Sequence, residues 1–163
     1  MTYQPYPTGG GGNQMAQRPP APQSIQNAVK LMYAGAALSA VGLIVGLATI
    51  GSLKNAIKSA DPSFTASQVH SAEVVGVASV IIGGLLGIGL WLWMARANAA
   101  GRSWARIVSS VLFGISTLEL VSTLARANSV LNLLFEGLVW LVGLGAIMFL
   151  WRRESSEYFA AAR

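Results

Sequence analysis

The sequence contains no cysteine and only one histidine, and these two shortages exclude several kinds of chemistry. Without cysteine the chain has no disulfide, no thiolate metal ligand, no thiol nucleophile and no site for palmitoylation or prenylation. With His70 as the single imidazole, a zinc site is not expected either. Neither a Walker phosphate-binding motif nor a GxSxG nucleophile motif occurs. We therefore expect no metal, no cofactor and no enzyme activity.

Charged residues are also scarce. They make up 10% of the chain, whereas 53% is hydrophobic, and soluble domains carry roughly 25% charged residues. Residues 74–95 contain no ionisable side chain, so a helix there is apolar on every side. Such a helix lies in lipid or deep in a core, and about twenty residues of this kind cross a bilayer. A soluble bundle would need polar outer faces, which residues 31–53 and 74–95 do not offer.

Four apolar runs predict an all-α fold, an integral-membrane four-helix bundle with a disordered N-terminal tail. Residues 1–23 hold five of the six prolines and a four-glycine run, so we expect this tail to be disordered. It serves either as a solubilising tail or as a polyproline-type ligand for a cytoplasmic partner. Residues 154–163 are expected to form a second, short cytoplasmic tail. The bundle domain, residues 24–153, has its expected spans at about residues 31–53, 74–95, 104–125 and 130–151.

Several residues mark the expected helix ends. Ser24 is expected to be the N-cap of the first helix. An Asp-Pro turn at residues 61–62 precedes Thr65 and Gln68, which fit a capping box, so the second helix should begin near residue 65, outside the membrane. The first apolar run exceeds the ~7 to 15 residues of a signal-peptide core, so we expect an uncleaved signal anchor.

The basic residues predict how the chain is threaded. With four spans, both termini and the middle loop share one side of the membrane. Eight of the eleven lysines and arginines lie on that side and three on the other. The positive-inside rule then makes both termini cytoplasmic, in the plasma membrane. Because the basic residues lie at the ends of apolar runs, the net charge of +5 does not indicate nucleic-acid binding.

The middle loop has the sequence RANAAGRSWAR, with three arginines and no acid between two apolar runs. Tryptophans at a membrane interface and arginines near lipid headgroups are typical anchors, and anionic lipids add about 1 kcal/mol for each basic residue. We expect an inner-face anchor made of Arg96, Arg102, Arg106, Trp91, Trp93, Trp104 and Trp151.

Small residues recur at helical spacing in the first two spans. Because lipid provides no hydrophobic drive between helices, their association depends on small residues that let backbones approach. Two interpretations stay open: the first two spans pack on each other, or they form the contact between copies of the chain. The residues concerned are Gly35, Ser39, Gly42, Gly46, Gly76, Gly83 and Gly87.

Glu119 is a charged residue inside an apolar run. It lies six positions before Ala125, hence roughly 9 Å along the helix from the expected end of its span. Charges at this depth are costly and often functional. One interpretation is a hydrogen-bonded carboxyl, with Arg126 on the same helix face, that locks the third span to its neighbours; the other is a proton or cation path that includes Glu136. Transporters normally carry more intramembrane polar residues or broken helices, which favours the first interpretation.

Three segments carry a resemblance: QSIQNAVKLMYAGAALSAVGLIVGL, WLWMARANAAGRSWARIVSSVLFGISTL and LVWLVGLGAIMFLWRRESSEYF. Over residues 23–159 the chain resembles a group of uncharacterised small four-span membrane proteins of high-GC Gram-positive (actinobacterial) bacteria. The resemblance implies the four-span architecture and a plasma-membrane location, and it brings no activity, ligand or site residue with it. We expect a non-enzymatic scaffold or accessory subunit that acts through helix packing and its cytoplasmic tail, on a membrane-protein partner or a second copy. The alternative is an oligomeric transporter or channel that uses Glu119.

Overall fold

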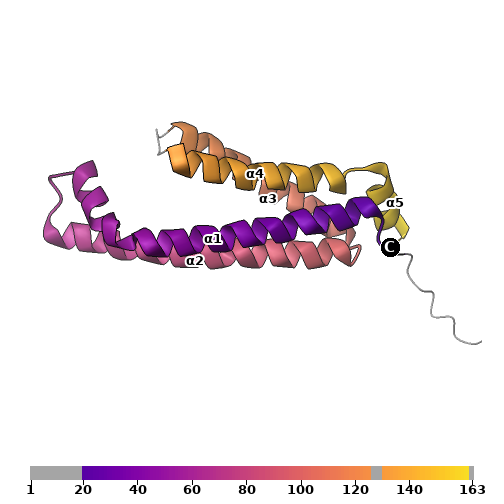
Figure 1. Ribbon diagram of the computed structural model, residues 1–163, viewed down its shortest axis with the longest axis horizontal. Helices are drawn as coiled ribbons and strands as arrows, with labels where there is room; N and C mark the ends of the chain where they lie inside the picture. The colour runs from indigo at the N-terminus through magenta and orange to yellow at the C-terminus, as the bar shows by residue number, and fades with distance from the viewer. Residues whose placement is uncertain (1–19, 126–129, 162–163) are drawn as a thin grey trace, which may run out of the picture.

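The structure, a computed structural model, describes residues 20–125 and 130–161, and every regular element in these ranges is a helix (Figure 1). The predicted all-α class is therefore confirmed. Four of the helices are long and apolar enough to cross a membrane, which supports a membrane protein. The helices are α1 (Gln23–Ala60), α2 (Ala66–Ala99), α3 (Ser103–Ala125), α4 (Val130–Leu150) and α5 (Arg153–Ala161).

The four long helices form two antiparallel hairpins. In the first, α1 and α2 lie side by side over most of their length; in the second, α4 packs along α3 (Figure 1). The hairpins meet mainly through α1 and α4, whereas α2 and α3, although consecutive in the chain, make few contacts. The bundle is therefore closed on its α1–α4 side and open on its α2–α3 side.

The hairpins differ in length. α1 has 38 residues and α2 has 34, whereas α3 has 23 and α4 has 21. At 1.5 Å per residue the first pair measures roughly 50 to 57 Å and the second roughly 32 to 35 Å, close to the ~30 Å hydrocarbon core. The starts of α1 and α3 and the ends of α2 and α4 lie near α5, so the first hairpin extends past the second at the opposite end (Figure 1). We call these two ends the α5 end and the far end.

The helix ends bear out one sequence prediction and contradict another. The Thr65 hydroxyl caps α2 by accepting from the Gln68 N–H (3.4 Å), and the Gln68 side chain accepts from the Thr65 N–H (2.8 Å), so the predicted capping box is present. Ser24, however, lies inside the first turn of α1, and Pro22 occupies the N-cap position. The prediction for Ser24 was wrong because its hydroxyl bonds to Ser155 instead (2.9 Å).

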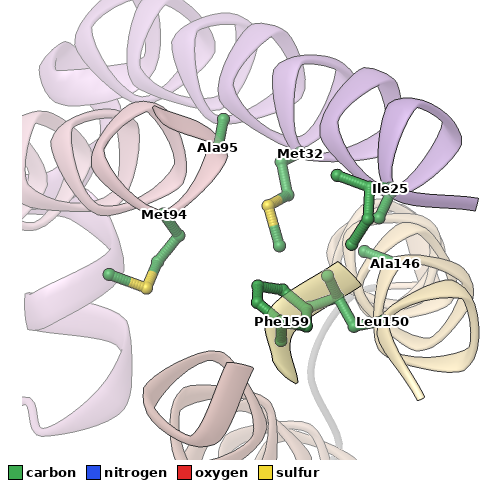
Figure 2. Close-up of a cluster of buried hydrophobic side chains, with 8 residues drawn as sticks. Ile25, Met32, Met94, Ala95, Ala146, Leu150 and Phe159 are labelled. Atoms are coloured by element: carbon green, nitrogen blue, oxygen red, sulfur yellow. The ribbon is translucent and has the colours of Figure 1, made fainter. Parts of the chain in front are cut away.

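The buried core lies at the α5 end. Side chains from α1, α2, α4 and α5 meet there, with Phe159 of α5 between the long helices (Figure 2). This buried cluster consists of Ile25, Ala28, Met32, Met94, Ala95, Ala146, Leu150 and Phe159. The turn between α2 and α3 contains Gly101, whose φ of 69° is a left-handed conformation that favours glycine.

Helix α5, where the sequence predicts a short tail, contacts every long helix. Its Ser155 hydroxyl bonds to Ser24 of α1 and donates to the carbonyl of Phe149 of α4 (2.7 Å). The Tyr158 hydroxyl donates to the carbonyl of Ala99 of α2 (3.0 Å). From α3, Arg106 Nη1 donates to the Ser156 hydroxyl (2.9 Å). α5 thus joins the two hairpins at one end.

Candidate functional site

A cavity of about 360 Å³ lies between the four long helices. Its walls include Met32 of α1, Trp91 of α2, Phe113 of α3 and Gly143 of α4. Among the described residues that line this central cavity, Glu119 is the only one with an ionisable side chain. The cavity is thus an apolar space with a single carboxyl group at its wall.

The Trp91 ring forms part of the wall because the missing side chain of Gly35 makes room for it. A Cβ added at Gly35 would lie 2.6 Å from Trp91 Cε2, and one added at Gly143 would lie 3.6 Å from Trp91 Cη2. The ring therefore occupies the space between α1 and α4. The sequence predicts Trp91 as part of an interfacial anchor; in the structure its ring packs against Gly35 and lines the central cavity.

A second, open pocket of about 480 Å³ lies between the far ends of α3 and α4. Its lining includes both Glu119 and Glu136, together with Thr123, whose hydroxyl donates to Glu136 Oε1 (3.2 Å). Glu119 lines both cavities and forms no hydrogen bond or ion pair with any other residue that the structure describes. The structure therefore brings two of the three candidate polar residues to one pocket, while Arg126 lies outside the described residues.

Most of the small residues of α1 and α2 face side chains of another helix of the same chain. A Cβ at Gly42 would lie 2.9 Å from Phe135 of α4, and one at Gly87 would lie 3.8 Å from the Ser39 hydroxyl oxygen of α1. Gly83 differs: a Cβ there would meet nothing within 4 Å, and the position in contact with α1 is the next residue, Gly84. The remaining packing contacts join Gly35 to Trp91, Gly46 to Val80 and Gly76 to Leu53.

The arginines of the middle loop have two different environments. Arg96 and Arg102 are exposed, as contact with headgroups requires. Arg106 is partly buried, and its guanidinium carbon lies 4.3 Å from the centroid of the Trp151 ring. Arg106 thus belongs to the packed α5 end, whereas Trp151, which it contacts, is 54% exposed. Trp93 and Trp104 are exposed and contact each other in a tilted arrangement, with ring centroids 5.5 Å apart and an interplanar angle of 45°.

Asn98, at the α5 end of α2, was missed in the sequence. It is fully buried, and its amide donates to the Ser109 hydroxyl of α3 (3.1 Å) and to the Met94 carbonyl (2.9 Å). Its Oδ1 has no hydrogen-bond partner among the residues that the structure describes. In the sequence Asn98 is a single amide side chain between two arginines. Because the second span is predicted to end at about Ala95, this position is expected to lie in a solvated loop. The added turn of helix turns Asn98 inward.

The chain matches no described protein family, no curated protein and no solved structure. In residues 20–125 and 130–161, no group of three histidine or acidic side chains could hold a metal ion. The site therefore rests on its geometry: an apolar cavity within the bundle, an open polar pocket beside it, and Glu119 at both.

Proposed function

We propose that the protein is a non-enzymatic, multi-pass scaffold or accessory subunit of the plasma membrane, related to the small actinobacterial four-span proteins it resembles. It acts on a membrane-protein partner, or on a second copy, through its helix surfaces and its N-terminal tail. The observation that carries this proposal is the open α2–α3 side of the bundle, where two consecutive helices make few contacts and expose apolar side chains. A helix from a partner can pack there without displacing a helix of this chain.

The proposed orientation has the α5 end in the cytoplasm. The start of α1, the turn between α2 and α3, and α5 all lie at that end (Figure 1). The described basic residues there are Lys30, Arg96, Arg102, Arg106, Arg152 and Arg153, against Lys54 and Lys58 towards the far end. The positive-inside rule supports this orientation, and Arg96 and Arg102 can then contact anionic headgroups.

Site-specific photo-crosslinking in native membranes tests the scaffold. A photoreactive residue at Leu86 of α2, which is 60% exposed, samples the open side. One at Ile44 of α1, which is 66% exposed, is the matched control. We expect a discrete protein adduct from Leu86, identified by mass spectrometry, and none from Ile44. Adducts with lipid alone at both positions would contradict the proposal.

A truncation tests the tail. Ala21 packs against the buried cluster and accepts a hydrogen bond from Gln26, so the deletion should remove residues 2–19 and leave Ala21 in place. If the tail recruits a partner, the Leu86 adduct should weaken in the truncated protein while its amount in the membrane is unchanged. An equal adduct yield would assign the interaction to the helices alone.

A second candidate, an oligomeric transporter or channel, is favoured by one observation: Glu119 lines both cavities. Glu119→Gln keeps the shape of the side chain and removes its charge. In proteoliposomes it should abolish proton or cation flux if this candidate is correct. Flux equal to that of the unaltered protein, or no flux from either, would exclude it.

A further inference from the structure

We propose that the central cavity binds a small hydrophobic organic cation, with Glu119 as its counter-charge and the rings of Trp91 and Phe113 as its walls. This inference names a ligand class for the second candidate and rests on the same cavity. It requires binding but no transport, so the two ideas can fail separately. It does not depend on the scaffold proposal, because it needs no partner protein, although Leu86 of the open α2–α3 side also lines the cavity.

The size and lining of the cavity fit a small apolar ligand. Its volume, about 360 Å³, falls within the ~300 to 1,000 Å³ typical of small-molecule sites. All four long helices contribute to the wall, and most of the lining side chains are apolar. A ligand that fills this space must therefore be mostly hydrophobic itself.

The charge of the ligand follows from Glu119. An unpaired carboxylate at membrane depth is costly, and Glu119 has no partner among the described residues. Glu119 is an exposed residue, so its carboxylate is accessible to a ligand; a cation would neutralise that charge, whereas an anionic or neutral ligand would leave it uncompensated. The ligand is therefore expected to be positively charged.

An inorganic cation does not fit the same space. Calcium takes about six to eight oxygen ligands, and magnesium keeps a near-octahedral shell. Besides Glu119, the described side chains around the cavity offer only the hydroxyls of Ser109 and Ser116, and Ser109 already accepts a hydrogen bond from Asn98. A weakly hydrated organic cation needs no such shell.

The aromatic residues complete the match. Organic cations bind to the faces of aromatic rings, most strongly to tryptophan, and the cavity presents Trp91 and Phe113. The thioether of Met32 adds a polarisable contact. The ligand can reach this space from the lipid, because Leu86 and Ile115 line the cavity and are also exposed on the open α2–α3 side.

The first test compares two acids. The full-length protein, in nanodiscs of uncharged phosphatidylcholine, is titrated with tetraphenylphosphonium by calorimetry, and with triphenylphosphine oxide as the uncharged control. Glu119→Gln should weaken binding of the cation at least tenfold, which equals 1.4 kcal/mol, and leave the uncharged compound unaffected. Glu136→Gln, the same change in the neighbouring pocket, should weaken cation binding less than threefold. Equal affinities for the cation in Glu119→Gln and the unaltered protein would overturn the proposal.

The second test fills the cavity. Gly83 and Gly89 lie on the same helix, and a Cβ at either would meet nothing within 4 Å, but only Gly83 lines the cavity. Gly83→Leu should therefore reduce tetraphenylphosphonium binding more than tenfold, while Gly89→Leu should change it less than twofold. Equal binding by the two variants would place the ligand elsewhere and overturn the proposal. Binding without flux in proteoliposomes would exclude the transporter and leave the site intact.

Discussion

The two hairpins are built from similarly apolar helices, yet different contacts hold them together. In the α1–α2 hairpin, glycines let a side chain of one helix rest against the backbone of the other. A Cβ at Gly46 would lie 2.8 Å from Val80 Cγ1. In the reverse direction, a Cβ at Gly76 would lie 2.8 Å from Leu53 Cδ2. Close approach of backbones stabilises this pair.

The α3–α4 hairpin is joined by polar groups instead. The Trp140 indole N–H donates to the Thr117 hydroxyl (3.0 Å), and the Thr123 hydroxyl donates to Glu136 (3.2 Å). These are the two ways in which helices associate in lipid, small residues in one hairpin and hydrogen bonds in the other. This difference predicts that substitutions which add volume destabilise the first hairpin, and that substitutions which remove polar groups destabilise the second.

The largest effect is expected where the hairpins are joined. Phe159 of α5 is 3% exposed and packs among residues of both hairpins. Phe159→Ala should lower the free energy of unfolding by about 3 to 5 kcal/mol, the range for a buried phenylalanine. Denaturant titration in detergent, followed by circular dichroism, measures this. Glu154→Ala, at an exposed position of α5, should change it by less than about 0.5 kcal/mol. Similar losses in the two variants would mean that α5 does not join the hairpins.

The next largest effect concerns the packing of α1. Gly35→Ala adds a Cβ that would lie 2.6 Å from the rigid Trp91 ring, so the unfolding free energy should fall by about 1 to 3 kcal/mol. Gly51→Ala adds the same atom to the same helix, where nothing lies within 4 Å. It should stabilise the helix by about 0.5 to 1 kcal/mol. If the two variants unfold alike, close approach does not stabilise the first hairpin.

A smaller effect should separate the second hairpin from the first. A double-mutant cycle of Thr117→Val and Trp140→Phe isolates the hydrogen bond between these side chains. We expect a coupling free energy of about 0.6 kcal/mol, the average for polar contacts between membrane helices. The same unfolding titrations provide the measurement. Strictly additive losses would show that ring packing, including the Phe113–Trp140 contact at 5.4 Å, holds α3 to α4.

The smallest effect lies in the turn of the first hairpin. The Ser63 hydroxyl (2.6 Å) and backbone N–H (3.0 Å) donate to the Asp61 carboxylate and lower its pKa below the usual aspartate value. The stability that this turn gains is therefore present above the usual pKa and is lost as the pH falls through the lowered one. Ser63→Ala should move the Asp61 pKa towards its usual value in a carbon-detected NMR titration. An unchanged midpoint would assign the shift to the backbone N–H alone.

Hydropathy and capping patterns were sufficient to predict the four long helices and the start of α2. Hydropathy depends only on the residues within each segment, and the capping box of Thr65 and Gln68 joins residues three positions apart. Neither feature depends on contacts with other helices. The contacts of Trp91 and Arg106 could not be predicted in this way, because they depend on glycines and side chains of other helices. Helix α5 was missed because nine residues form no stable helix alone, and its order comes from tertiary packing.

The candidate site was predicted in part. Glu119 could be predicted as a candidate because it is a charged residue in an apolar run. Glu136 lines the same pocket because α3 and α4 form a hairpin. The cavity had no signal in the sequence, because it arises from the loose contact of α2 with α3 and from the space that Gly35 leaves for the Trp91 ring.

The position of α5 also has a consequence for biosynthesis. Membrane helices insert as independent units before they associate, and a growing chain folds from its N-terminal side. The core at the α5 end needs Phe159, which follows all four long helices in the chain. During translation both hairpins therefore reach the bilayer before the element that joins them exists. A chain arrested before residue 153 should be an inserted but loosely assembled intermediate, and membrane quality-control proteases should degrade it faster than the finished protein.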